Sequence, residues 1–316
     1  MTARTQVTQP VGRPEQSGPD GLLRVRLDIS YDGAGFHGWA RQPGLRTVQA
    51  ELEQAVRAIA RVPAEVPVRA AVAGRTDTGV HAVGQVCHCD LPADAWLRAG
   101  SVRSGADSPQ EPAHADRVRR RLNAVLPPDL RVRGVALAVP GFDARWSAAW
   151  REYSYLVADD PRDGDPRARG FVLASRPLDV ALMDAAAASF VGEHDYAAFC
   201  RARPGASTVR TVHHISWARR PSEAGGAGLA EFRIRSDAFC HSMVRALVGS
   251  FLAVGEGRWP VERPGELLAA AVRVPEVATA PAHGLTLVAV GYPDDSDLGD
   301  QARRSKRWRG RQQPAS

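Results

Sequence analysis

The sequence of 316 residues predicts an α+β protein built on a largely antiparallel sheet. Three observations lead to this prediction. Several segments alternate apolar and polar residues with a period of two, which is typical of half-buried strands. Other segments repeat apolar residues at helical spacing. Short polar links join neighbouring strands in a hairpin-like manner, and both halves of the chain mix strands with helices, which favours α+β architecture.

The N-terminal half begins with a clearly alternating strand and an amphipathic helix. Thr47 stands just before the helical pattern, where its hydroxyl can cap the first turn. A glycine-rich loop, residues 33–44, separates the two elements. The expected elements are a strand in 22–33, a helix in 47–62, a strand in 85–91 and a helix in 117–132 that Pro127 and Pro128 end.

The pattern restarts in the C-terminal half. Asp179 is placed to cap the first helix of this half, and Gly192 to close it. The second helix is strongly apolar, with Met243, Leu247 and Phe251 on one stripe. The expected elements are strands in 151–158, 211–220, 229–236 and 283–293, with helices in 178–192 and 241–257.

Length and composition suggest how the chain is divided. A chain of this length is enough for roughly two domains. We expect an N-terminal α/β half over residues 21–146 and a C-terminal α/β half over residues 147–293. Residues 1–20 are polar and 294–316 are basic, so both are expected to be disordered tails. Residues 98–116, rich in Gly, Ser, Pro and Asp, resemble a surface insertion.

Composition also limits the class of protein. No run of about 18 apolar residues exists, so no membrane span is expected, and residues 1–21 lack the apolar core of a signal peptide. Four cysteines without a CxxC pair favour a reducing, cytoplasmic setting. The 41 basic residues exceed the 35 acidic ones, and all but Lys306 are arginines. An arginine-rich, mildly basic chain is compatible with nucleic-acid binding.

One short stretch, "AVAGRTDTGVHAVGQ" at residues 71–85, isolates a single acid. Asp77 lies between Gly74 and Gly79, which permit unusual backbone angles and close approach of a ligand. An ordinary turn would explain an aspartate here without any function. "DTG" is also a short signature of aspartic proteases, but no second copy occurs and no apolar run precedes it. The remaining possibility is a lone carboxylate that acts as nucleophile or base.

A metal site is not expected. The "CHC" stretch at residues 87–89 places its neighbouring side chains on opposite faces of a strand, which is a poor arrangement of ligands.

The whole string "AGRTDTGVHAVGQ" resembles the signature of the TruA family of tRNA pseudouridine synthases. The resemblance spans about residues 22–292, with further matches in the family's order. The segment before Met243 departs from the family's usual pattern at Cys240 and Ser242. The other matching segments are "YDGAGFHGW", "TVQAELEQAV", "REYSYLV", "FVGEHDYAAFC", "VRTVHHISW", "DAFCHSMVRALVGSFLAVGEG" and "APAHGLTLVAVGY".

The resemblance implies a pseudouridine synthase fold, with a mixed, mostly antiparallel sheet, flanking helices and two similar halves around a basic cleft. It implies a homodimer that isomerises uridines 38, 39 and 40 in the anticodon stem-loop of tRNA without cofactor or metal. Asp77 matches the family's catalytic aspartate, and Tyr153 the tyrosine that stacks on the target base. Arg75 matches an arginine that holds the base out of the helix, and Arg245 one that pairs with the aspartate.

The sequence does not decide which atom of the substrate Asp77 attacks, nor whether the protein is catalytic at all. The aspartate could add to uracil C6, or it could act at ribose C1′ and assist cleavage of the glycosidic bond. In either case the carboxylate must be ionised, and a guanidinium such as that of Arg245 would favour the charged form. Gly249, one turn further along the same helix, could leave room for that approach. The alternative from another class is a tRNA-binding or RNA-chaperone protein whose catalytic activity is lost or secondary; an inactive binder would not need Asp77.

Overall fold

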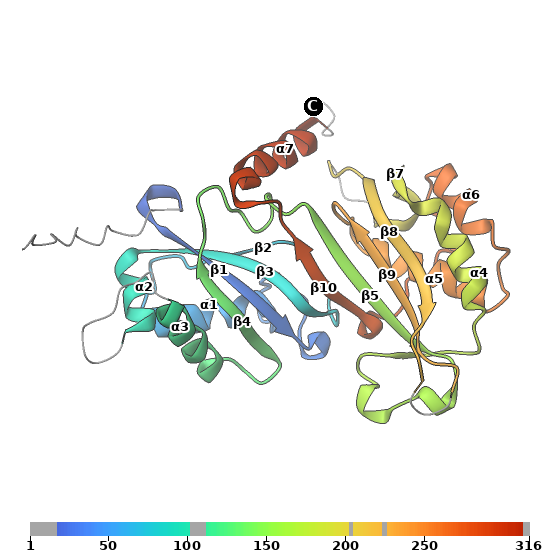
Figure 1. Ribbon diagram of the computed structural model, residues 1–316, viewed down its shortest axis with the longest axis horizontal. Coiled ribbons are helices and arrows are strands. Elements are labelled where there is room, and N and C mark those ends of the chain that lie inside the picture. Colours follow the sequence, from blue (N-terminus) through green and yellow to red (C-terminus); the bar gives the residue numbers. More distant parts are fainter. Residues whose placement is uncertain (1–17, 102–111, 202–204, 223–225, 312–316) are drawn as a thin grey trace, which may run out of the picture.

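The computed structural model describes residues 18–101, 112–201, 205–222 and 226–311. Their strands form one sheet in the order β4-β1-β3-β10-β5-β9-β8-β7, with β2 paired to β3 and β6 paired to β5 (Figure 1). The strands are β1 Leu23–Tyr31, β2 Ala70–Val72, β3 His81–Leu91, β4 Leu130–Leu137, β5 Trp150–Ala158, β6 Leu173–Ala174, β7 Gly192–Asp195, β8 Val209–Arg219, β9 Ala230–Ser236 and β10 Leu285–Gly291.

Helices flank the sheet in two groups. Helices α1 to α3 gather beside the N-terminal strands, and α4 to α6 beside the C-terminal strands, as Figure 1 shows. Within the described residues, only β10 with β3 and β5 with β6 pair in parallel, so the predicted mixed, mostly antiparallel α+β fold is confirmed. The helices are α1 Val48–Ala60, α2 Ala93–Gly100, α3 Pro112–Val125, α4 Val180–Ala187, α5 Met243–Gly255, α6 Arg263–Ala270 and α7 Leu298–Arg311.

Local patterns explain several elements directly. Buried and half-buried residues alternate along β1 without interruption, as its sequence predicts. The Thr47 hydroxyl accepts a hydrogen bond from the Ala50 N–H at 3.4 Å and caps α1. The Asp179 carboxylate caps α4 in the same way, through the Leu182 N–H at 3.0 Å. The helix is shorter than predicted, because a 3-10 turn follows Ala187 and Gly192 opens β7.

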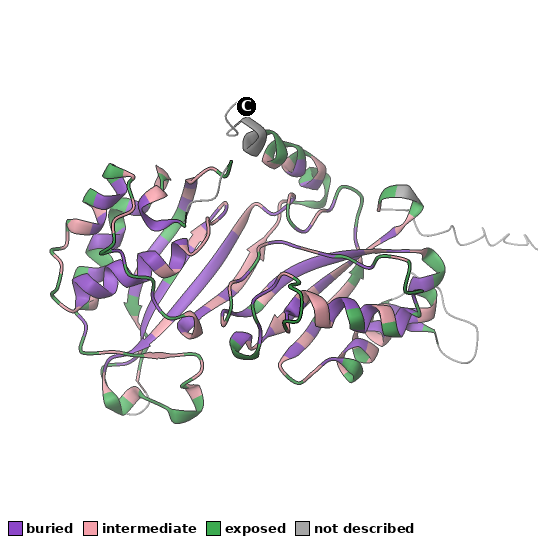
Figure 2. Ribbon diagram, turned by 180° about the vertical axis from the view of Figure 1, so that it is seen from behind, coloured by how far each residue is buried: buried purple, intermediate pink, exposed green. Residues whose placement is uncertain are grey.

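The last strand of the sheet joins the two halves. β10 lies between β3 and β5, although both of these precede it by more than a hundred residues. The main hydrophobic cluster is continuous from β1 and α1 to α5, and buried residues extend along the strands and the sheet-facing sides of the helices (Figure 2). The boundary expected at residue 146 lies in the link between β4 and β5. That each half is a separate domain stays a prediction.

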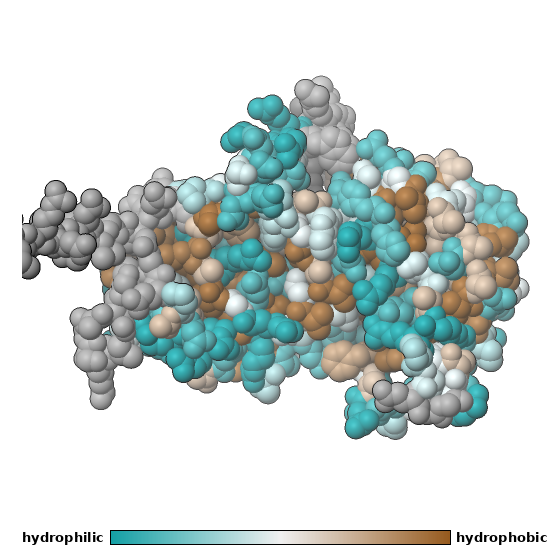
Figure 3. Space-filling view, viewed as in Figure 1, coloured by the Kyte–Doolittle hydropathy of each residue, from teal (hydrophilic) through white to brown (hydrophobic). Residues whose placement is uncertain are grey.

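One expectation about an irregular segment is wrong where the structure describes it. Residues 298–311 were expected to be a disordered tail, but they form α7, a helix that projects from the body with a hydrophilic surface (Figures 1 and 3). Leu298, only 2% exposed, anchors this helix against Phe142 and Ala144. The expected insertion at 98–116 contains the end of α2 and the start of α3. Residues 1–17 and 102–111 lie outside the described ranges.

No helix in the described part of the chain is both long enough and apolar enough to cross a membrane.

Candidate active site

Asp77 lies on the loop between β2 and β3, packed against the glycine-rich loop of residues 33–44. The Trp39 N–H donates to the Thr76 carbonyl at 3.0 Å, and the Thr76 hydroxyl lies 2.8 Å from the Tyr31 hydroxyl. Gly38 has a φ of +83°, and a Cβ there would lie 2.9 Å from the Thr76 oxygen. Only glycine therefore allows the two loops to approach this closely. The side chain of Asp77 remains 36% exposed.

A histidine from far along the chain faces this carboxylate. His241 Nε2 lies 3.7 Å from Asp77 Oδ1, and the His241 side chain is 26% exposed. His241 stands just before Ser242, the N-cap residue of α5, so residues 164 positions apart meet here. Nothing in the sequence alone marks His241 as a site residue. The one sign that could have indicated it is its place in "DAFCHSMVRALVGSFLAVGEG", one of the segments that resemble the family.

Tyr153 lies on β5 close to the same site. It is 7% exposed, and its ring packs edge-on against Phe239, with ring centroids 5.1 Å apart. Burial raises the pKa of the Tyr153 hydroxyl, and electrostatic interactions with Tyr31 and Asp77 raise it further. The structure therefore places Tyr153 within the electrostatic influence of Asp77 and keeps its hydroxyl protonated at neutral pH.

Arg245 lies one turn into α5 but is bound elsewhere. Its Nε donates to the Ala280 carbonyl at 2.7 Å, and the Ala280 N–H donates back to the Arg245 carbonyl at 3.0 Å. The space beside Gly249 is occupied by backbone, because a Cβ there would lie 2.2 Å from the Ala278 oxygen. Among the described residues, the expected ion pair between Arg245 and Asp77 is not formed, and it is the His241 imidazole that lies 3.7 Å from the Asp77 carboxylate.

Arg75 precedes Asp77 by two residues and is exposed. A second arginine lies near it: the pKa of Arg145 is lowered, first by burial and then by the positive charge of Arg75. Two neighbouring guanidinium groups that repel one another form a local concentration of positive charge. Such a concentration suits a phosphate group.

Arg151 binds the segments around the site together from within. Its guanidinium is almost fully buried and donates to the carbonyls of Ala73, Arg145, Ala148 and Asp237, at 2.7 to 3.2 Å. Burial lowers its pKa. Ala73 leads into the Asp77 loop and Asp237 leads towards His241. One buried side chain therefore connects the Asp77 loop to the C-terminal half.

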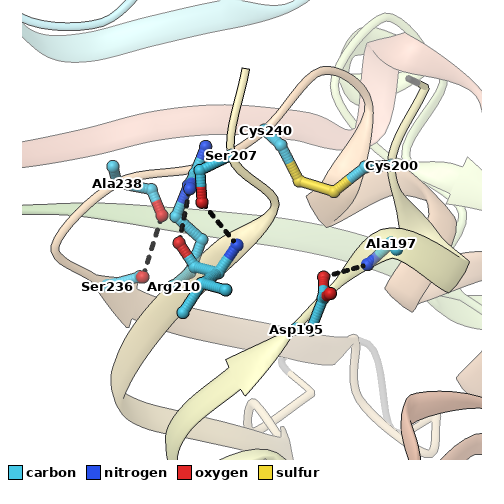
Figure 4. Close-up of a disulfide and its surroundings, with 9 residues drawn as sticks. Asp195, Ala197, Cys200, Ser207, Arg210, Ser236, Ala238 and Cys240 are labelled. Carbon is cyan, nitrogen blue, oxygen red and sulfur yellow. Dashed lines mark hydrogen bonds between the residues drawn. A yellow bond between two sulfur atoms is a disulfide. The ribbon is translucent and has the colours of Figure 1, made fainter. Parts of the chain in front are cut away.

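A disulfide holds the segment that presents His241. Cys200 and Cys240 are bonded, with Cα atoms 5.8 Å apart, and Figure 4 shows the bond beside the end of β9. This bond differs from the expectation of a reducing setting, which rested on the lack of a CxxC pair; two cysteines 40 residues apart leave no such local signal. Cys87 and Cys89 are free and buried in β3.

The described residues contain no group of three or more His, Cys, Asp or Glu side chains arranged to hold a metal ion. His88, between the two free cysteines, accepts a hydrogen bond from the Ala144 N–H at 3.1 Å. Burial lowers the pKa of His88 to about 4, so its imidazole is neutral at pH 7.

Known proteins resemble this chain over nearly its whole length. A family model described as tRNA pseudouridine synthase matches residues 186–293. A protein named tRNA pseudouridine synthase A from Frankia casuarinae is 53% identical, over 90% of this chain and 94% of the relative. Proteins of the same name from Streptomyces griseus and Mycobacterium leprae are 47% and 44% identical, over 92% and 89% of this chain and 95% and 93% of the relatives.

A solved structure, a Cbf5-Nop10-Gar1 complex, covers 72% of this chain and 54% of its own. At 14% identity and a TM-score of 0.26, this likeness is too weak to indicate a shared fold or function. The sequence identity to the three relatives is far higher and extends over nearly the whole chain, which shows that the chain belongs to the tRNA pseudouridine synthase A family.

Proposed function

We propose that this chain, an isomerase that converts uridine to pseudouridine in tRNA, acts on the anticodon stem-loop at positions 38, 39 and 40. The observation that carries the proposal is the setting of Asp77. It is a partly exposed carboxylate on a loop packed against the glycine-rich loop, with a buried tyrosine and a pair of arginines nearby.

The reaction needs few protein groups, because the substrate supplies both reacting ends. The bond between ribose C1′ and uracil N1 breaks, the uracil turns, and C1′ bonds to C5. The proton from C5 is released to solvent, and N1 takes up a proton. We propose that Asp77 starts this sequence as a nucleophile, adding either to uracil C6 or to ribose C1′. Its exposed position leaves the carboxylate accessible to a nucleotide.

The target nucleotide must leave its stack to reach Asp77. Flipping a base costs a few kcal/mol, which stacking in a protein pocket can offset. We assign the stacking to Tyr153, whose position beside Asp77 and contact with Phe239 support this role. An aromatic platform contributes about 1–3 kcal/mol per base. Arg75 would hold the base outside the helix, and its neighbour Arg145 would bind a phosphate.

We propose a role for Arg245 that differs from the pairing with Asp77 implied by the family resemblance. Its hydrogen bond to Ala280 supports a role in shaping the wall of the site, from which its remaining guanidinium nitrogens can meet the substrate. We also propose that the protein works as a homodimer in the cytoplasm, without cofactor or metal, as the family resemblance implies.

Release of tritium from tRNA labelled at uracil C5 tests the proposed function. Wild type should release tritium to water, and Asp77→Asn should release none while binding tRNA with nearly unchanged affinity, because phosphate contacts dominate affinity. Asp295→Asn, which removes an exposed carboxylate near the start of α7, is the matched control and should behave as wild type. Substrates with single uridines at 38, 39 or 40 locate the target.

Two results would contradict the proposal. Turnover by Asp77→Asn at the wild-type rate would remove Asp77 from the reaction. Binding of tRNA without tritium release from the wild type would favour an RNA-binding protein.

A further inference from the structure

The histidine beside Asp77 is not explained by packing alone. His241 Nε2 lies 3.7 Å from Asp77 Oδ1, which is longer than a strong hydrogen bond but close enough for electrostatic attraction. Arg245, the cation expected here, donates instead to the Ala280 carbonyl. His241 is therefore the basic side chain that faces Asp77 in the described part of the chain.

The segment that carries His241, residues 237–242, is fixed at almost every position. The Asp237 carboxylate accepts from the Thr211 N–H at 3.0 Å and from the Ala238 N–H at 2.7 Å. Phe239 packs on Tyr153. Figure 4 shows this segment beside the disulfide, with Ser236 donating to the Ala238 carbonyl at 2.9 Å. The segment has little freedom to move relative to β5 and β8.

Two contacts restrain His241 itself through its neighbours in sequence. Cys240 is bonded to Cys200, and the Arg201 N–H donates to the His241 carbonyl at 3.0 Å. The chain next to Cys200 thus holds both the residue before His241 and the backbone of His241. These contacts fix the backbone from which the imidazole extends.

The residue after His241 has an unusual backbone conformation. Ser242 has a φ of +63° and a ψ of 8°, in the left-handed region that non-glycine residues seldom adopt. It occupies the N-cap position of α5, yet its side chain makes no capping hydrogen bond. Strained conformations of this kind persist where the surrounding structure determines them, and they cluster at functional sites. Here the strain accompanies the turn that presents His241 to Asp77.

We propose that His241 is a positioning residue for pseudouridine formation, which holds the Asp77 carboxylate so that Oδ1 faces the imidazole and Oδ2 faces the nucleotide. This rests on the proposed role of Asp77. A carboxylate free to rotate presents either oxygen in many orientations, and a neighbour that fixes one oxygen keeps the other in a reactive geometry.

Substitutions of His241 test the proposal in the full-length protein with unmodified tRNA. His241→Ala should slow single-turnover pseudouridine formation by about tenfold to a hundredfold at saturating tRNA, because misplacement of a reacting group has effects of this size. The affinity for tRNA should change by no more than about twofold, since phosphate contacts dominate it. The loss should therefore appear in kcat and leave KM nearly unchanged.

A conservative variant separates positioning from folding. His241→Gln places an amide nitrogen near the position of Nε2, and it should recover a measurable part of the rate lost in His241→Ala. His214→Ala is the matched control, because His214 is an exposed histidine on β8 whose ring bonds to Ser216. It should react at the wild-type rate.

Three results would overturn the inference. The first is a wild-type rate in His241→Ala. The second is an equal loss in the Gln and Ala variants together with a lowered Tm, which would indicate a structural role only. The third is weaker tRNA binding with an unchanged rate at saturation. Asp77→Asn keeps the two proposals distinct: if that variant is active the proposed function fails, whereas if it is inactive and His241→Ala is normal, only the present inference fails.

Discussion

At the scale of single residues, a buried guanidinium holds together loops that come from both halves of the chain. Arg151 donates to four backbone carbonyls from three separate segments. Buried carbonyls that lose their donors cost about 1–3 kcal/mol each, unless water replaces the donor. The stability of the fold and the geometry of the Asp77 loop should therefore both depend on this side chain.

Replacement of Arg151 tests that dependence. Arg151→Met keeps a similar apolar volume but removes all the donors, so we expect the free energy of unfolding to fall by about 3 kcal/mol. Arg151→Lys keeps one cationic group and should lose less. Urea unfolding measures both, and single-turnover rates show whether the Asp77 loop has moved. A Met variant as stable and as active as wild type would contradict this account.

At the scale of elements, the packing of α5 depends on a glycine. Gly249 lets the backbone of residues 278–280 lie directly on the helix, where the Ala280 carbonyl accepts from Arg245. Gly249→Ala would place a methyl group 2.2 Å from the Ala278 oxygen. The segment of residues 278–280 must then move away from α5, and the hydrogen bond from Arg245 to the Ala280 carbonyl must lengthen.

We expect Gly249→Ala to lower both the Tm and the reaction rate, in spite of alanine's better helix propensity. Gly265→Ala is the matched control in α6, because the atom nearest its added methyl is the Ser189 hydroxyl oxygen at 3.3 Å, on a side chain that can turn away. It should be neutral or slightly stabilising, by up to about 1 kcal/mol. Thermal unfolding of the two variants side by side decides the matter, and equal shifts would count against the packing argument.

Elements with a strong local pattern could be predicted, and those that depend on distant contacts could not. β1 follows from its alternation and α1 from its period and cap, since both signals lie within about fifteen residues. The helix α7 was missed because its sequence is highly charged and few of its described residues, such as Leu298, are buried against the body. At the site, Asp77 stands out within one loop, whereas nothing in the local sequence indicates that His241 meets it.

At the scale of the whole molecule, stability in acid should reflect carboxylates held in their charged form. Asp159, at the end of β5, is buried, which disfavours its charge, but hydrogen bonds from Arg219 and from the Leu178 N–H outweigh this effect and its pKa is lowered. A group with a lowered folded pKa stabilises the fold above its unfolded pKa of about 4, and this contribution is lost as the pH falls further.

Asp159→Asn should therefore be clearly less stable than wild type at pH 7, and the difference should shrink as the pH falls below about 4. Urea unfolding at several pH values measures that difference. A difference that stays constant with pH would mean that the charge of Asp159 does not contribute.

The position of β10 has a consequence for how the protein is made. This strand is the last of the described sheet to be synthesised, yet β3 and β5 both pair with it and are not neighbours of one another in that sheet. While the ribosome is still translating the preceding residues, the sheet has an open gap at its centre, and the exit tunnel retains the newest part of the chain. The enzyme should therefore become able to modify RNA only after its release from the ribosome. Chains truncated before residue 285 lack β10 and should be inactive in pseudouridine formation.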